Sequence, residues 1–140
     1  MPQTRSLVVA GALLFFLGLV QGSGVPMFAN PRMALSAHLT AVQSGTALMI
    51  VGLVWLMAVW APFVQRLSLR TMVGGFYGLW VGISLAAMTG ANETLSIAGR
   101  GYGANRAIEA AVSVLVIGSS AFLTVGWLMF LIALVRRQKP

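Results

Sequence analysis

Apolar residues form four long runs along the chain, separated by short polar breaks. The runs cover residues 7–28, 35–63, 71–88 and 107–135, and the third is the shortest and most polar. A helix needs roughly 20 apolar residues to cross the hydrocarbon core of a bilayer, where its backbone must satisfy its own hydrogen bonds. The pattern therefore predicts an all-α integral membrane protein, a four-helix bundle with a single domain over residues 1–140.

The composition favours the same class of protein. Hydrophobic residues make up 59% of the chain and charged residues only 8%, whereas about a quarter of the residues of a soluble domain are charged. We therefore expect the lipid bilayer to cover most of the surface. The sequence has no cysteine, which excludes a disulfide framework, a thiolate metal site and a cysteine nucleophile.

The net charge of +7 does not indicate nucleic-acid binding, because the basic residues stand at the ends of the apolar runs. With four spans, one side of the membrane carries Arg5, Arg66, Arg70, Arg136, Arg137 and Lys139. The other side carries Arg32, Arg100 and Arg106 against Glu93. The positive-inside rule therefore predicts a multi-pass protein of the cell inner membrane with both termini in the cytoplasm.

The first run also has features of a signal peptide, with Arg5 before the apolar stretch and small residues at 22–24 that could be cleaved. However, the apolar character continues to Phe28. We therefore interpret this run as the first membrane span.

Small residues recur every four positions on two of the predicted spans. They are Ala37, Ala41 and Gly45 on the second span and Gly74, Gly78 and Gly82 on the third. Such stripes let helix backbones approach closely in lipid. Contact within one bundle is the simpler interpretation, and contact between subunits of an oligomer is the alternative.

His38, near the start of the second span, is the only histidine in the sequence. At 100° per residue, Ala41 and Gly45 lie within about 60° of it around the helix. The imidazole therefore projects beside a strip with little side-chain bulk, against which a flat ligand such as haem could lie. A histidine that is hydrogen-bonded at a helix interface explains the same pattern, and the residues alone leave both interpretations open.

The remaining polar positions indicate little chemistry. Glu109, near the start of the fourth span, is expected to cap its helix or to pair with Arg106. The glycines at 99, 101 and 103 follow no predicted strand and are expected to form a flexible loop instead of a dinucleotide site. No paired-carboxylate site, Ser-His-Asp set or multi-histidine zinc site is present in the sequence.

The segment Asn-Pro-Arg-Met-Ala-Leu-Ser-Ala-His-Leu at residues 30–39 closely resembles the hydroxylaminobenzene mutase family. Residues 13–19 (Leu-Leu-Phe-Phe-Leu-Gly-Leu) and residues 97–102 (Ile-Ala-Gly-Arg-Gly-Tyr), followed by Glu109, are also similar to that family. The resemblance covers nearly the whole chain. It implies a membrane-bound isomerase that rearranges an arylhydroxylamine to an aminophenol.

The styrene oxide isomerases look like more distant relatives. Their resemblance implies that His38 is an axial ligand of haem b, which is held between the subunits of a homotrimer, with Ala41 and Gly45 beside it. The iron would act as a Lewis acid toward a small apolar aromatic substrate that arrives through the lipid. On this interpretation the residues expected to orient the substrate, and so to be catalytic, are Ser44, Tyr77 and Trp80.

The chain departs from the polar pattern of these families at three positions. Ser44 stands where the mutases have Asn, Gly82 stands where they have a second Asn, and Ala86 stands where the epoxide isomerases have Tyr. These differences bear on the reaction more than on the fold. An epoxide-to-aldehyde isomerase and a non-catalytic membrane haem-binding protein are therefore the alternative functions.

Overall fold

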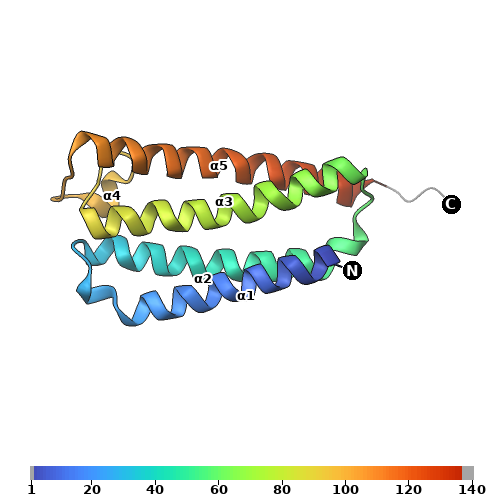
Figure 1. Cartoon of the computed structure of the whole chain (residues 1–140), viewed down its shortest axis with the longest axis horizontal. Coiled ribbons are helices and arrows are strands. Elements are labelled where there is room, and N and C mark those ends of the chain that lie inside the picture. The colour runs from blue at the N-terminus through green and yellow to red at the C-terminus, as the bar shows by residue number, and fades with distance from the viewer. Residues whose placement is uncertain (1, 137–140) are drawn as a thin grey trace.

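Four long helices run side by side along the molecule (Figure 1). The computed structural model describes residues 2–136. The long helices are α1 (Pro2–Ser23), α2 (Pro31–Val54), α3 (Pro62–Thr89) and α5 (Arg106–Val135). Two 3-10 turns, η1 (Val25–Met27) and η2 (Trp55–Met57), follow α1 and α2, and the short α4 (Ser96–Gly99) lies between α3 and α5. The predicted all-α, four-span fold is confirmed.

Local sequence signals explain where these helices begin and end. Asn30 accepts a hydrogen bond from the Met33 N–H at 3.1 Å, so it caps α2. Proline at the first position begins α3 at Pro62, well before the predicted start of the third span at residue 71. Gly90, with φ of 82°, ends this helix in a left-handed conformation that favours glycine.

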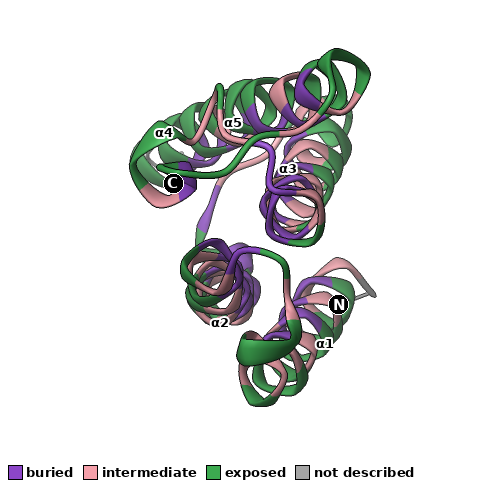
Figure 2. Cartoon of the chain, turned by 90° about the vertical axis from the view of Figure 1, so that its left-hand side faces the viewer, coloured by how far each residue is buried: buried purple, intermediate pink, exposed green. Residues whose placement is uncertain are grey.

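The helices pair in the order in which they occur along the chain. α1 packs mainly on α2, and α3 packs mainly on α5, while contacts between α2 and α3 join the two pairs. The end view in Figure 2 shows the two pairs one above the other, with α2 and α3 at the junction. These two central helices are correspondingly the more buried of the four.

Glycines bring the backbones of α1 and α2 into contact. A Cβ atom added at Gly11 would lie 2.6 Å from the carbonyl oxygen of Gly45, and one added at Gly45 would lie 2.6 Å from that of Gly11. Further along, a Cβ at Gly18 would lie 2.8 Å from the Cβ of Ala41. The predicted small-residue stripe on the second span is therefore a contact within one chain.

The stripe on the third span forms a similar contact only in part. A Cβ at Gly78 would meet the Ser119 side chain of α5, and one at Gly82 would lie 3.0 Å from a Val116 methyl carbon. Around Gly74 no atom lies within 4 Å of such a Cβ among the described residues. Gly74 therefore lies outside the interface between α3 and α5.

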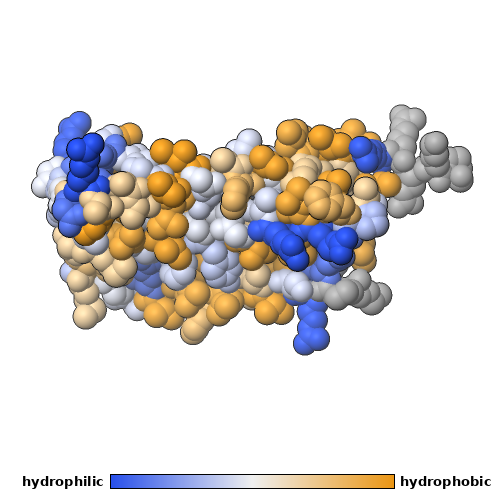
Figure 3. All heavy atoms as spheres, turned by 45° about the horizontal axis from the view of Figure 1, so that its top comes forward, coloured by the Kyte–Doolittle hydropathy of each residue, from blue (hydrophilic) through white to orange (hydrophobic). Residues whose placement is uncertain are grey.

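The outer surface of the helices is apolar, as expected for contact with lipid. On the face drawn in Figure 3, the most hydrophilic side chains lie toward the two ends of the bundle, and apolar and near-neutral side chains lie between them. One end carries Arg5, Arg66, Arg70 and Arg136, and the other carries Arg32, Arg100 and Arg106 with both glutamates. The predicted basic residues Arg137 and Lys139 lie outside the described residues.

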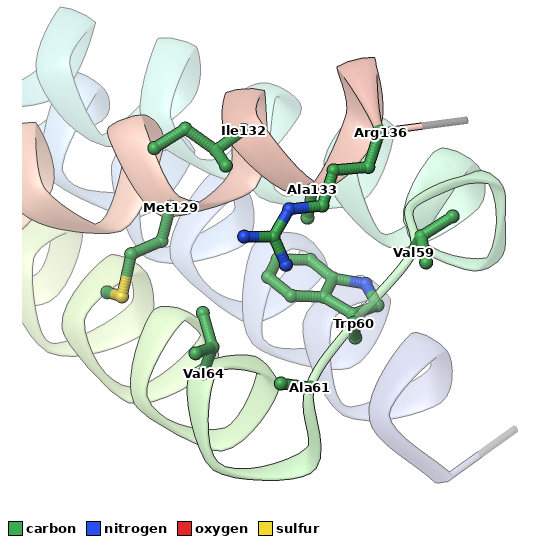
Figure 4. A pocket seen from close by; sticks show the side chains of 8 residues that line it. All are labelled: Val59, Trp60, Ala61, Val64, Met129, Ile132, Ala133 and Arg136. Atoms are coloured by element: carbon green, nitrogen blue, oxygen red, sulfur yellow. The ribbon is translucent and has the colours of Figure 1, made fainter. Parts of the chain in front are cut away.

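Aromatic stacking closes the end of the bundle where the described termini lie. The ring of Trp55 stacks on Trp60 with centroids 4.5 Å apart and on Phe130 at 5.7 Å. The Val59 N–H donates to the Ala133 carbonyl at 2.8 Å, which ties the turn after α2 to the end of α5. Figure 4 shows the side chain of Arg136 extending over Trp60 at this end. An arginine beside a tryptophan suits the boundary between lipid and water.

The contact between α1 and α2 predicts a large difference between two glycine substitutions. Gly45→Ala should lower stability by about 1–3 kcal/mol, because its methyl group has to displace the backbone of α1. The matched change Gly74→Ala has open space and should be neutral or slightly stabilising. Thermal unfolding of both variants in detergent would measure this, and equal unfolding temperatures would contradict the interface described.

Candidate functional site

His38 lies on α2, half-buried, with its ring against α1. Its Nδ1 atom is 2.7 Å from the carbonyl oxygen of Gly18. A carbonyl only accepts hydrogen bonds, so in the neutral imidazole Nδ1 carries the proton and donates it. The Nε2 atom is then unprotonated and has a free lone pair.

A glycine on α1 makes room for this ring. A Cβ added at Gly22 would lie 2.6 Å from Nδ1 and 2.7 Å from Cε1 of His38. Within residues 2–136 the Nε2 atom has no hydrogen-bond partner, and it is not sealed inside the protein. A backbone carbonyl that orients the imidazole through Nδ1 is a common arrangement around a ligating Nε2.

This arrangement fits a group that takes one imidazole ligand. Residues 2–136 contain no cluster of three or more His, Cys, Asp or Glu side chains that could enclose a metal ion. A haem group would need only one imidazole from this chain, because the porphyrin itself supplies four nitrogen donors to the iron. The Nε2 atom of His38 could supply that imidazole donor, since Nδ1 is held by the Gly18 carbonyl.

The other residues predicted for the cofactor lie beneath His38 in the contact between α1 and α2. Ala41 is fully buried against Gly18, and Gly45 packs on the backbone of Gly11 and Phe15. Within one chain they set the distance between the helices and present no exposed strip. Ser44 is also buried on α2, about 120° around the helix from His38. The structure therefore does not bring Ser44 together with the imidazole.

Tyr77 and Trp80, the other predicted catalytic residues, lie on α3 and reach across to α1. The Tyr77 hydroxyl donates to the Ala10 carbonyl at 2.8 Å. The Trp80 indole N–H donates to the Gln21 Oε1 at 2.6 Å, and the Gln21 Nε2 donates to the Ser84 hydroxyl at 3.0 Å. Three side chains from two helices thus form one hydrogen-bonded network.

This network lies in an open groove of about 430 Å³ between α1 and α3. The apolar part of its lining consists of Leu17, Val20, Phe28, Val81, Leu85 and Met88. Gln21, Trp80 and Ser84 complete the lining, but their polar atoms are hydrogen-bonded to one another and the groove surface is almost entirely apolar. The size and lining would suit a small apolar ligand.

Gln21 and Ser84 are not among the residues predicted from the sequence. The signal was present, since both are polar residues inside or at the edge of apolar runs. His38 lies on the side of α1 that faces α2, whereas Gln21 lies on the side that faces α3. Within one chain, α1 therefore separates the imidazole from the groove.

Hydrogen bonds join the connection between α3 and α5 to the first residues of α2. Asn30 donates through Nδ2 to the Ala98 carbonyl at 3.0 Å, and its own N–H donates to the Ala87 carbonyl at 2.9 Å. Arg32 donates to the Arg100 carbonyl. The asparagine and arginine of the segment at 30–39 thus hold this connection in place at one end of the bundle.

Glu109, on α5, also binds this connecting segment through hydrogen bonds. Its carboxylate is 3% exposed and accepts the backbone N–H groups of Asn92, Glu93 and Ala104 at 3.0 to 3.2 Å. The expectation of helix capping or an ion pair with Arg106 was wrong, because Asn105 caps α5 and Glu109 reaches back to the preceding residues. The residues on either side of the glycine-containing stretch are thereby held by specific hydrogen bonds.

Comparison with known proteins connects this arrangement to a family. The styrene oxide isomerase family matches residues 3–136. Hydroxylaminobenzene mutase HabB of Ectopseudomonas oleovorans is 34% identical over 125 residues, which cover 89% of this chain and 76% of that protein. Hydroxylaminobenzene mutase HabA of the same organism is 38% identical over 90 residues, which cover 64% and 67%. No solved structure matches the chain significantly.

The hydrogen bonds of Glu109 predict a selective loss of protection in the connection. In Glu109→Ala, three backbone N–H groups lose their acceptor, at a cost of about 1–3 kcal/mol for a group that stays buried. We expect the amides of Asn92, Glu93 and Ala104 to exchange faster with deuterated water. The exposed Glu93→Ala is the matched control and should leave their exchange unchanged. Equal exchange in both variants would refute the assigned role.

Proposed function

Since this chain belongs to the styrene oxide isomerase family and is a membrane-bound isomerase, we propose that it rearranges an arylhydroxylamine to an aminophenol. In this reaction the N–O bond breaks and a C–O bond forms on the aromatic ring. A ring proton is lost and the nitrogen gains a proton. Atoms and electrons balance, so the reaction needs no oxidant, reductant or second substrate.

The observation that carries this proposal is the similarity to the two hydroxylaminobenzene mutases, one of which aligns over 89% of this chain. Both relatives are named for the rearrangement of a hydroxylaminobenzene. The surface of the chain between its ends is largely apolar, which suits a neutral aromatic substrate that arrives through the lipid.

We further propose that His38 holds haem b through Nε2. The supporting observations are the Gly18 carbonyl that fixes the proton on Nδ1 and the space left by Gly22. When bound, the haem would supply a Lewis acid that polarises the substrate oxygen. Its place between the subunits of a homotrimer remains part of the proposal, consistent with an Nε2 that is not sealed inside one chain.

The residues of the chain would bind and orient the substrate and exclude water. A position at membrane depth limits attack by bulk water on a charged intermediate. Tyr77 and Trp80 donate their protons to Ala10 and Gln21 within the chain, so their roles as direct donors to the substrate remain predictions. The same is true of Ser44, which is buried on α2.

The location in the cell belongs to this proposal as well. Four arginines lie at the end of the bundle with both described termini, and that end has no carboxylate within residues 2–136. We propose that this end faces the cytoplasm and that the protein lies in the inner membrane.

Epoxide-to-aldehyde isomerisation is the second candidate. It is favoured by the family match over residues 3–136, because that family is described by its styrene oxide isomerase activity. Both reactions are isomerisations of an apolar aromatic molecule at a C–O or N–O bond. Conversion of styrene oxide to phenylacetaldehyde without conversion of an arylhydroxylamine would favour this candidate.

The proposed ligand predicts the haem absorption of purified variants. Protein supplied with haem should show a Soret band that is lost in His38→Ala. In Gly22→Leu the band should be weakened, because the new side chain occupies the position of the imidazole. Gly74→Leu, at an open position, is the control and should keep the band. An unchanged spectrum in His38→Ala would refute the ligand assignment.

The proposed reaction predicts the origin of the product oxygen. We expect phenylhydroxylamine in ¹⁸O-labelled water to yield aminophenol without the label, because the hydroxyl group moves within the substrate. His38→Ala should lose this activity. Product that carries the label would mean that water attacks the ring, and the transfer mechanism would then be wrong.

A further inference from the structure

Arg66 and Arg70 lie one turn apart on the outer side of α3, at the end of the bundle with the described termini. Both side chains are exposed, and within residues 2–136 neither guanidinium has a hydrogen-bond acceptor or a carboxylate partner. The two glutamates, Glu93 and Glu109, lie at the opposite end. Like charges one turn apart repel each other and destabilise a helix slightly. The described part of the chain supplies nothing that offsets this repulsion.

The length of α3 gives the depth of this pair in the membrane. The helix has 28 residues. The apolar run of residues 71–88 covers about 27 Å of it, close to the roughly 30 Å of a hydrocarbon core. Residues before 71 therefore lie outside the core. At about 1.5 Å per residue, Arg70 and Arg66 lie about 2 and 8 Å beyond it, which is the depth of the lipid headgroups.

A groove of about 220 Å³ joins the two arginines to apolar side chains. It is lined by Phe63, Arg66, Leu67 and Arg70, which lie within about 100° of one another around the helix. Gly74, one turn deeper in the membrane, leaves open space, since a Cβ there would have no atom of the described residues within 4 Å. The surface of α3 therefore changes from cationic to apolar in the direction of the bilayer centre.

We propose that this surface binds one anionic phospholipid, with its phosphate between Arg66 and Arg70 and an acyl chain along the apolar side chains of the groove. Guanidinium groups match phosphate oxygens in paired, charge-assisted hydrogen bonds. Basic pockets beside membrane helices bind anionic lipid headgroups. A zwitterionic phospholipid fits less well, because its ammonium group would come close to two guanidinium groups.

The other arginines at this end do not form such a pair. Arg5 lies on α1, and Arg136 follows α5. The side chain of Arg136 extends over Trp60, beside a separate groove of about 200 Å³ (Figure 4). Arg5 and Arg136 together carry the same charge at the same end of the bundle as the proposed site. They therefore provide a matched control for general attraction between a positive surface and anionic lipid.

The test is native mass spectrometry of the full chain in detergent, mixed with dioleoylphosphatidylglycerol or with dioleoylphosphatidylcholine, which has the same acyl chains. We expect one molecule of the anionic lipid to bind about tenfold more tightly than the zwitterionic lipid. Arg66→Gln combined with Arg70→Gln should abolish this preference. Arg5→Gln combined with Arg136→Gln should retain it. If the first double variant does not fold, Arg70→Gln compared with Arg5→Gln decides the matter.

Two results would overturn the inference. An equal loss of the preference in both double variants would mean that only the general surface charge attracts the lipid. Displacement of the anionic lipid by an equal concentration of glycerol phosphate, which has no acyl chain, would mean a site for free phosphate. Neither haem nor an aromatic substrate enters this assay, so its outcome is independent of the proposed reaction.

Discussion

The close contact between the backbones of α1 and α2 determines the geometry around His38. Gly11 and Gly45 lie so near each other that a Cβ on either would be 2.6 Å from the opposite carbonyl oxygen. At this separation the imidazole reaches the Gly18 carbonyl at 2.7 Å and occupies the space above Gly22. In lipid, where water gives no drive to bury apolar surface, such packing is the main force between helices. The tautomer of the histidine is thus a consequence of helix packing.

Helix α1 serves both parts of the candidate site. Its glycines face α2, and Ala10 and Gln21 face α3, where they accept hydrogen bonds from Tyr77 and Trp80. A rotation of α1 about its axis would disturb the histidine and the groove together. At the end of the bundle near α4, Asn30 and Glu109 hold the connecting segment through backbone hydrogen bonds. Both helix pairs are therefore tied at this end.

The four membrane-spanning helices could be predicted from the sequence, because apolar length alone determines whether a helix can cross a bilayer. It also singled out His38 and the small residues beneath it. It did not indicate the partners of Gln21, which lie 59 and 63 residues away on α3. Nor did it indicate that Glu109 would hold a loop. Periodicity tells which face of a helix is apolar, but not which other element that face meets.

The pairing of consecutive helices bears on how the chain is made. The tightest contacts join α1 to its successor α2, and α3 to α5, which follows it through the short α4 connection. Each pair is a helical hairpin whose interface is complete as soon as its second helix leaves the ribosome. Contacts between segments close in sequence form fast. The chain can therefore enter the bilayer as two successive hairpins. Only the contact between α2 and α3 has to form after the second hairpin has been made.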